Sequence, residues 1–261
     1  MSLFSKISSH FLAPSSDRLL EDGAINMFWF SGEANIGDVI SPYIVSSLAK
    51  REVKAADKRE HPKLLAVGSI MHYARAGDVV WGTGVISDNA RLKSKRIRVA
   101  AVRGPRTRAY LLRHGVDCPE IYGDPAILMP ELLNVGPVEK KYSLGIVPHY
   151  KDTHLVNVND PSIKIISVTE DASEFVANLM SCERIVSSSL HGIILAESYG
   201  VPADWVKLSE NLVGGEFKFY DYYEGTGRCA AEPLDYKMLY QERDIEQANF
   251  ERNKLINAFP M

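Results

Sequence analysis

The segment with the clearest capacity for chemistry is Arg184–Pro202, which reads RIVSSSLHGIILAESYGVP. Its apolar start predicts a buried strand, its serines predict a turn, and His191 falls in the first turn of the helix that follows. Ser188 and Ser189 can cap this helix, whose dipole holds an imidazole near its neutral form. A single histidine is more often structural, but the turn and the free helix end favour a base or a hydrogen-bond donor here.

A second candidate segment is Phe30–Asp38, which reads FSGEANIGD. It predicts a strand end, a glycine-containing turn and a helix with Pro42 in its first turn. The unpaired N–H groups of such a helix attract an anion. Asn35 and Asp38 could hold a substrate hydroxyl, and they could equally be turn and cap residues only. The GxGxxG spacing of dinucleotide-binding loops is not found here, so no NAD site is predicted.

Three short motifs, WGTG, VRGPRT and GDPA, each follow a predicted strand in the first half of the chain. The carboxyl ends of parallel strands meet at one edge of a sheet. The residues expected at that edge are Gly82, Thr83, Arg103, Arg106 and Asp124. A guanidinium forks onto carboxylate or phosphate, and we expect Arg103 to do so because it lies between a strand and a helix. Arg106 fits either this edge or the solvated surface.

Alternating apolar runs and helical patterns predict an α/β fold. In the first half, the expected strands are Ile25–Phe30, Leu64–Val67, Val79–Trp81, Ile97–Val102 and Ile121–Tyr122, and the expected helices are Ser41–Lys50 and Pro105–His114. In the second half, the expected strands are Ser143–Val147, Lys164–Val168, Arg184–Ser187 and one near Trp205, and the expected helices are Ala172–Met180 and Leu190–Tyr199.

The segment 134–141 contains glycine, proline and charges without apolar periodicity, and we place a domain boundary there. The prediction is two Rossmann-like β/α domains, 1–137 and 138–261, that face a central cleft where open α/β proteins bind ligands. Residues 211–228, rich in Gly and Tyr, predict a long loop. Residues 244–258 predict a charged amphipathic helix, which can pack back on the first domain. At the N-terminus, the helical spacing of Phe4, Ile7, Phe11 and Leu12 predicts a short helix packed on its own domain.

Composition excludes several classes of protein. The net charge is −3, which gives no global attraction to nucleic acid or to an anionic membrane. The three cysteines are widely spaced and show no metal-ligand pattern, so we expect them to be reduced and structural in a cytoplasmic protein. No apolar run is long enough to span a membrane, and no export signal is visible.

The runs ANIGD, VRGPRT, GDPA and SSSLHGIILAESYGVP resemble the polysaccharide pyruvyl transferase family, in the family's order and over about residues 31–202. The stretch Phe217–Tyr223, FKFYDYY, also resembles the family's sequence after this helix. The resemblance implies a fold similar to two-domain glycosyltransferases of the GT-B type. It further implies phosphoenolpyruvate as donor, no cofactor, and a ketal product on an exopolysaccharide or other cell-surface saccharide. In the family, the LHG histidine and an upstream arginine contact phosphoenolpyruvate, and Leu190, His191 and Arg103 match these positions.

Ketal formation needs a proton for the methylene carbon, a sugar hydroxyl that attacks the adjacent carbon, and departure of phosphate. We assign proton transfer to His191 and the anion to Arg103, with the backbone N–H groups of Ser189 to His191 completing the phosphate site. His149, past the first strand of the second domain, is the second acid/base candidate, and it could equally be a loop histidine. The predicted substrate contacts are Asn35, Asp38, Gly82, Thr83, Arg106, Asp124, Ser188, Ser189, Leu190 and Glu197. Asn35, Asp38, Arg103, His149 and His191 are expected to converge on one cleft.

No metal is expected, since the carboxylates and histidines lack ligand spacing. The acceptor can be lipid-linked, which would bring the cytoplasmic protein to the inner face of the membrane. One alternative is a glycosyltransferase in which Ser188–Glu197 holds the diphosphate and ribose of a sugar nucleotide. Another is a noncatalytic protein that binds a sugar or an anion.

Overall fold

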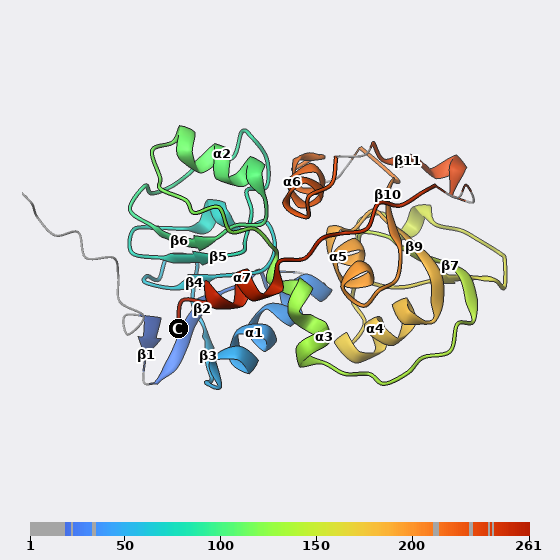
Figure 1. The fold of residues 1–261 in the computed structure, drawn as a ribbon, viewed down its shortest axis with the longest axis horizontal. Helices are drawn as coiled ribbons and strands as arrows, with labels where there is room; N and C mark the ends of the chain where they lie inside the picture. Colours follow the sequence, from blue (N-terminus) through green and yellow to red (C-terminus); the bar gives the residue numbers. More distant parts are fainter. Residues whose placement is uncertain are drawn as a thin grey trace, which may run out of the picture.

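The structure is a computed structural model that describes residues 19–21, 23–32, 35–210, 214–229, 232–239, 241 and 243–261. It contains two β-sheets that lie side by side with helices between them (Figure 1). The N-terminal helix expected around Phe4 and Phe11 falls outside the described residues. Within the described residues, no helix is long and apolar enough to cross a membrane.

The first sheet has the order β1-β2-β4-β5-β6, and β3 also pairs with β2. All pairings are parallel except that of β1 with β2. Its strands are β1 (Leu20–Glu21), β2 (Ala24–Phe28), β3 (Val53–Ala55), β4 (Leu64–Leu65), β5 (Val79–Trp81) and β6 (Arg98–Ala101). β5 is buried along its whole length, as a parallel strand covered on both faces must be.

The second sheet is parallel throughout, with the order β11-β10-β9-β7-β8. Its strands are β7 (Tyr142–Val147), β8 (Ile163–Ile165), β9 (Cys182–Ser187), β10 (Ala203–Lys207) and β11 (Leu234–Asp235). The mixed α/β class with two largely parallel sheets is therefore as predicted, and it is compatible with two Rossmann-like domains. The expected strand Ile121–Tyr122 is only an isolated bridge between Val102 and Tyr122.

The α-helices are α1 (Ile36–Ala49), α2 (Pro105–Arg113), α3 (Met129–Leu132), α4 (Ala172–Met180), α5 (Leu190–Ser198), α6 (Phe217–Gly225) and α7 (Arg252–Asn257). Short 3₁₀ helices are η2 (Met71–Tyr73), η3 (Pro125–Leu128), η4 (Thr153–Leu155) and η5 (Tyr236–Met238). Two expectations were wrong: α6 replaces half of the loop expected at 211–228, and of the tail helix expected at 244–258 only α7 forms. α6 forms because Phe219, Tyr222 and Tyr223 bury one helical face.

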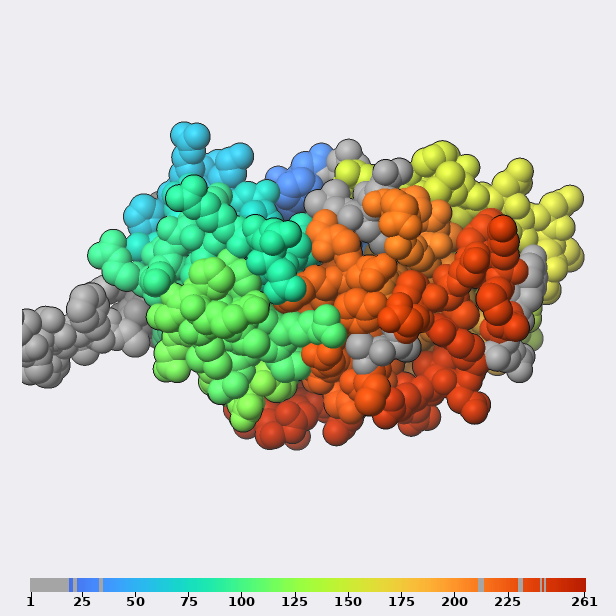
Figure 2. All heavy atoms as spheres, turned by 90° about the horizontal axis from the view of Figure 1, so that it is seen from above, coloured from blue at the N-terminus to red at the C-terminus, as the bar shows by residue number. Residues whose placement is uncertain are grey.

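The two halves of the chain are joined by shared packing and by backbone hydrogen bonds. The N–H of Ile36 at the start of α1 donates to the carbonyl of Val168 beyond β8, at 2.7 Å. α6, in orange, packs against α2, in green, on the face shown in Figure 2. The C-terminal segment crosses back from the second sheet to the first (Figure 1), where the indole of Trp81 donates to the carbonyl of Leu255 at 2.9 Å. These contacts fix the strand ends of the two sheets relative to one another.

Candidate active site at the junction of the two sheets

Helix α5 belongs to the second half of the chain, and it places the side chain of His191 against residues of the first half. The Ser187 hydroxyl accepts from the N–H of Ser189 at 3.0 Å. The carbonyls of Val147 and Ser189 both lie 2.8 Å from this hydroxyl and share its one proton, and this turn directs the start of α5. The ring of His191 lies on Gly37 in the first turn of α1, where any β-carbon would overlap it. Glycine at 37 therefore serves close approach, which the sequence alone did not reveal.

Two carboxylates face the His191 ring. Nε2 of His191 lies 3.7 Å from Oδ2 of the fully buried Asp124 and has no hydrogen-bond partner among the described residues. Asp124 is fixed by the N–H groups of Gly68 at 3.1 Å and Ala126 at 3.0 Å. Burial raises the pKa of Asp38 to about 6, although the charge of His191 and the hydrogen bond from Asn35 oppose this shift. An imidazolium formed here would be neutralised by its neighbours.

Asn35 is the N-cap of α1. Its Oδ1 accepts from the N–H of Gly37 at 3.1 Å, and its amide donates to Asp38. The carbonyl oxygen and the amide group of the Asn35 side chain are thus both hydrogen-bonded within the protein. Of the two roles that the sequence allowed, cap residue or substrate contact, the structure shows the cap. Asp38 remains beside His191, so the pair belongs to the site through the histidine.

The structure changes the role expected for Arg103. This side chain is fully buried, and Nε donates to Asp221 of α6 at 3.0 Å. Its other donors reach the Ser69 hydroxyl at 2.6 Å and the Val85 carbonyl at 2.9 Å. No edge of the guanidinium is left open to a substrate. Arg103 instead holds α6 against the loop that contains Gly68 and Ser69, beside His191.

His149 lies beyond the carboxyl end of β7, next to the serine turn. The backbone N–H of His149 donates to the Ser188 hydroxyl at 2.8 Å, and that hydroxyl donates to Asp152 at 3.1 Å. Burial, together with the charges of Lys218 and Lys151, lowers the pKa of His149 to about 4, although the charge of Asp152 opposes this shift. Because Nδ1 accepts from the Lys151 N–H at 3.3 Å, the neutral ring carries its proton on Nε2. At neutral pH, the His149 ring is therefore neutral, so it can donate a hydrogen bond but does not act as a general acid.

Lys218 on α6 is a residue of this site that the sequence reading missed. Its ammonium has no hydrogen bond or ion pair among the described residues, although it lies over the Phe219 ring at 5.4 Å from the centroid. Burial and the charge of Arg103 together lower the pKa of Lys218 to about 8, although the charge of Asp152 opposes this shift. The lysine therefore lies within electrostatic reach of both the Arg103 loop and the His149 turn. A half-buried cation without an acceptor is a natural partner for an anion.

The first turn of α5 supplies further donors. The N–H of Ser189 is already satisfied by Ser187, contrary to the expectation that it would bind phosphate. In the part of the chain that the structure describes, no acceptor meets the N–H groups of Leu190 and His191. Ser189 is the N-cap by position, yet its side chain makes no capping bond, and Ser188 is held by Asp152. The expected side-chain caps are therefore not formed.

Four other predicted contacts have partners inside the protein. The buried Thr83 hydroxyl donates to the Gly68 carbonyl at 2.8 Å, and Gly82 closely approaches Pro125, so both shape the loop under His191. Arg106 forms an ion pair with Glu224 at 2.7 Å, away from the His191 ring. Glu197 is buried and bound by Arg228 at 2.6 Å and by the Tyr222 hydroxyl at 2.5 Å.

Chemically, the junction presents a histidine between carboxylates and, beside it, a set of unsatisfied donors. The structure brings Asn35, Asp38, Asp124 and His191 together, with Arg103 behind them and His149 on the other side of the serine turn. Among the described residues, no group of three or more His, Cys, Asp or Glu side chains could hold a metal ion. The arrangement suits proton transfer next to a bound anion.

Comparison with known proteins places the chain in a family. A family model described as polysaccharide pyruvyl transferase matches residues 35–206. An uncharacterized protein of Acanthamoeba polyphaga mimivirus is 31% identical over 215 residues, which cover 78% of this chain and 75% of that protein. The succinoglycan biosynthesis protein ExoV of Rhizobium meliloti (strain 1021) is 27% identical over 217 residues, which cover 77% of this chain and 64% of ExoV. No solved structure matches the chain. Because the family model covers about two thirds of the chain, including VRGPRT, GDPA and the segment around His191, the resemblance is confirmed, and the chain belongs to the polysaccharide pyruvyl transferase family.

Proposed function

We propose that the protein moves the pyruvyl group of phosphoenolpyruvate onto two hydroxyls of a saccharide to form a ketal. The observation that carries this proposal is a set of donors at the junction that have no acceptor among the described residues: the Lys218 ammonium and the N–H groups of Leu190 and His191. The two N–H groups lie in the helical turn that carries His191, and Lys218 is within electrostatic reach of His149 and Arg103, so an anion bound to these donors would be near a proton-transfer group. Family membership supports pyruvyl transfer to a polysaccharide, and the donor set supports the anionic donor.

Phosphoenolpyruvate fits this donor set by charge. Its phosphate and carboxylate together carry about three negative charges at neutral pH. The ammonium of Lys218 and the positive end of α5 would meet one anionic group each. Burying an unpaired ammonium is costly, and the lowered pKa of Lys218 reflects that cost. A bound anion would offset it, so ligand binding should stabilise the protein.

The reaction balances with the groups available. One hydroxyl proton of the acceptor moves, through a base, to the methylene carbon of phosphoenolpyruvate, which becomes a methyl group. The sugar oxygen bonds to the adjacent carbon, a second hydroxyl oxygen bonds to the same carbon, and the carbon–oxygen bond to phosphate breaks. The second proton leaves on phosphate. His191 is the proposed proton carrier, and Asp38 and Asp124 would stabilise its charged form during transfer.

His149 would take a supporting part. Its neutral Nε2–H can donate a hydrogen bond to the donor substrate, because Nδ1 is engaged by the Lys151 N–H. We propose that no divalent cation is required, since the lysine and the helix end supply the positive charge. We also propose a division into domains at 137/138 and an arrangement like that of two-domain glycosyltransferases, which the two separate sheets support.

The rival assignment, a glycosyltransferase that uses a sugar nucleotide, is less favoured by the geometry. It needs the Glu197 carboxylate for the ribose hydroxyls, but both carboxylate oxygens are bound by Arg228 and Tyr222 in a buried network. The rival would therefore require an existing ion pair to break before the nucleotide could bind.

The proposal is tested by calorimetry with phosphoenolpyruvate, and separately with UDP, in buffer that contains a chelator. We expect phosphoenolpyruvate to bind and UDP not to bind. Lys218→Met should weaken phosphoenolpyruvate binding about 10- to 100-fold, the usual loss for one hydrogen bond to a charged group. The matched control is Lys141→Met, which removes the same charge from the exposed segment before the opposite end of β7.

Binding of UDP in place of phosphoenolpyruvate would contradict the proposal and support the glycosyltransferase. Binding that requires magnesium or manganese would contradict the cation-independent site. Equal losses in Lys218→Met and Lys141→Met would mean that Lys218 acts only through the overall charge of the protein.

A further inference from the structure

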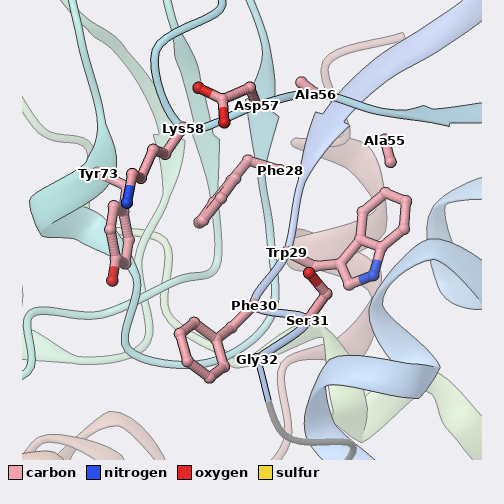
Figure 3. Close-up of a pocket in the computed structure, with 10 residues that line it drawn as sticks. All are labelled: Phe28, Trp29, Phe30, Ser31, Gly32, Ala55, Ala56, Asp57, Lys58 and Tyr73. Carbon is pink, nitrogen blue, oxygen red and sulfur yellow. The ribbon is translucent and has the colours of Figure 1, made fainter.

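A pocket of about 290 Å³ opens at the carboxyl ends of β2 and β3, outside the residues that surround His191 (Figure 3). Its size is at the lower end of the ~300 to 1,000 Å³ range of small-molecule sites, enough for one sugar ring. Its walls combine aromatic rings with exposed polar groups. A pyranose has the same two-sided character, because its C–H groups form an apolar face and its hydroxyls form a polar rim.

The aromatic wall is built by the alternation of β2 as the strand ends. Phe28 and Phe30 project to one side of the chain, toward Tyr73 of η2, whereas Trp29 projects to the other side, toward Ala55 (Figure 3). The rings of Phe28 and Tyr73 lie 4.8 Å apart between centroids and support one another. Phe28 is buried and anchors the wall, while Phe30 is 39% exposed.

Phe30 offers a fixed platform. Its ring lies against the backbone of Gly32, where a β-carbon would be 2.8 Å from the ring carbon Cζ. The glycine therefore lets one side of the ring pack on the chain while the ring keeps an exposed part. Large, stiff aromatic surfaces bind the apolar face of a ligand with little loss of conformational entropy.

The polar rim comes from the turn after β3. One carboxylate oxygen of Asp57 accepts from the Arg59 N–H at 2.8 Å, which orients the carboxylate. Among the described residues, nothing occupies its other oxygen or the ammonium of Lys58. These groups are an acceptor and a donor for sugar hydroxyls. Asp57 and Lys58 are both exposed, so this side of the pocket is open to solvent.

The pocket is connected to the His191 site along two stretches of chain. Gly32 is three residues before Asn35, so their Cα atoms are at most about 11 Å apart. On the other wall, Tyr73 follows closely after Ser69, which bonds Arg103, and Gly68, whose β-carbon would lie 3.7 Å from the His191 ring. A short saccharide with one sugar in this pocket could therefore extend toward His191, the proposed proton carrier.

We infer that this pocket, with Phe30 as platform and Asp57 and Lys58 as rim, binds one pyranose unit of the acceptor saccharide. That the bound saccharide is the acceptor rests on the proposed function, whereas binding of a pyranose in this pocket can be tested by itself. The ring stacks its C–H face on Phe30 and directs hydroxyls to the rim. The saccharide then extends past Gly32 toward His191.

The test is saccharide binding without phosphoenolpyruvate. Methyl glycosides of galactose, glucose and mannose are titrated while tryptophan fluorescence is followed, because Trp81 and Trp205 are buried and Trp29 borders the pocket. We expect at least one glycoside to bind and to change the signal. Phe30→Ala should weaken it about tenfold, the usual effect of losing one aromatic contact. Asp57→Asn, an exposed and structurally mild change, should weaken it as well.

The matched control is Tyr43→Ala, which removes an aromatic ring of similar exposure, 41%, from α1 of the same half of the chain. Absence of binding by all three glycosides would overturn the pocket assignment. So would binding that Phe30→Ala and Asp57→Asn leave unchanged. Glycoside binding that depends on Phe30, in a protein that does not transfer pyruvyl groups from phosphoenolpyruvate, would uphold the pocket and refute the proposed function instead.

Discussion

Replacing Gly37 by alanine should disable His191 without removing any chemical group from the site. A β-carbon at position 37 would overlap three atoms of the His191 ring, and even the farthest of them, Cγ, would be only 2.6 Å away, whereas ordinary contacts begin at 3.4 Å. The ring belongs to a side chain that can rotate, so it should relieve this overlap by moving more than about 1 Å. A displacement of about 1 Å at a reacting group can cost ~100-fold in rate.

Folding should tolerate this change. Alanine is favoured over glycine inside a helix by ~1 kcal/mol, which offsets part of the ~1 to 3 kcal/mol that overpacking costs. The assay measures phosphate release from phosphoenolpyruvate with acceptor saccharide, together with the thermal midpoint. The control is Ser47→Ala on the same helix, which adds helix propensity without touching His191. Full turnover in a folded Gly37→Ala protein would refute the placement of the proton carrier at His191.

Three further predictions concern charge. Phosphoenolpyruvate affinity, measured by calorimetry, should fall as the pH rises through about 8, because the ammonium of Lys218 is lost there, and Lys218→Met should show no such fall. Arg103→Met should lower the free energy of unfolding in urea by about 3 to 5 kcal/mol, because Asp221 is left buried and unpaired. The folded-state pKa of Asp38, about 6, lies above the ordinary 3.8, so its ionisation costs stability above pH 6 and nothing below 3.8. Asp38→Asn should therefore raise the thermal midpoint at pH 8 and leave it unchanged at pH 3.5.

The regular elements could be predicted wherever one periodicity dominated. The strand Val79–Trp81 and the helix Ala172–Met180 were predicted at their observed bounds. The first is a short apolar run, which indicates a buried strand, and the second has the apolar spacing of an amphipathic helix. α6 was missed because the segment 211–228, in which it lies, is rich in glycine and tyrosine and therefore resembles a loop in composition. The spacing of Phe219, Tyr222 and Tyr223 at positions i, i+3 and i+4 was the available signal for a helix.

The site was predictable in its local parts only. The strand, serine turn and helix placed His191 correctly at the start of α5, since these features are set by neighbouring residues. The partner of Arg103 lies 118 residues away, and one sequence contains no signal for such a pairing. For the same reason, the guanidinium looked available for substrate, while Lys218, a half-buried cation with no hydrogen-bond or ion-pair partner among the described residues, went unnoticed within a predicted loop.

The most direct test of the central claim is to follow the pyruvyl carbons themselves. Phosphoenolpyruvate labelled with ¹³C at its methylene carbon is incubated with the protein and an acceptor saccharide, and the saccharide fraction is examined by NMR. We expect a labelled methyl group bonded into a ketal on the saccharide, one phosphate released per ketal, and loss of both with His191→Asn in a folded protein. Phosphate release without a labelled ketal, or a ketal formed at full rate by His191→Asn, would contradict the central claim.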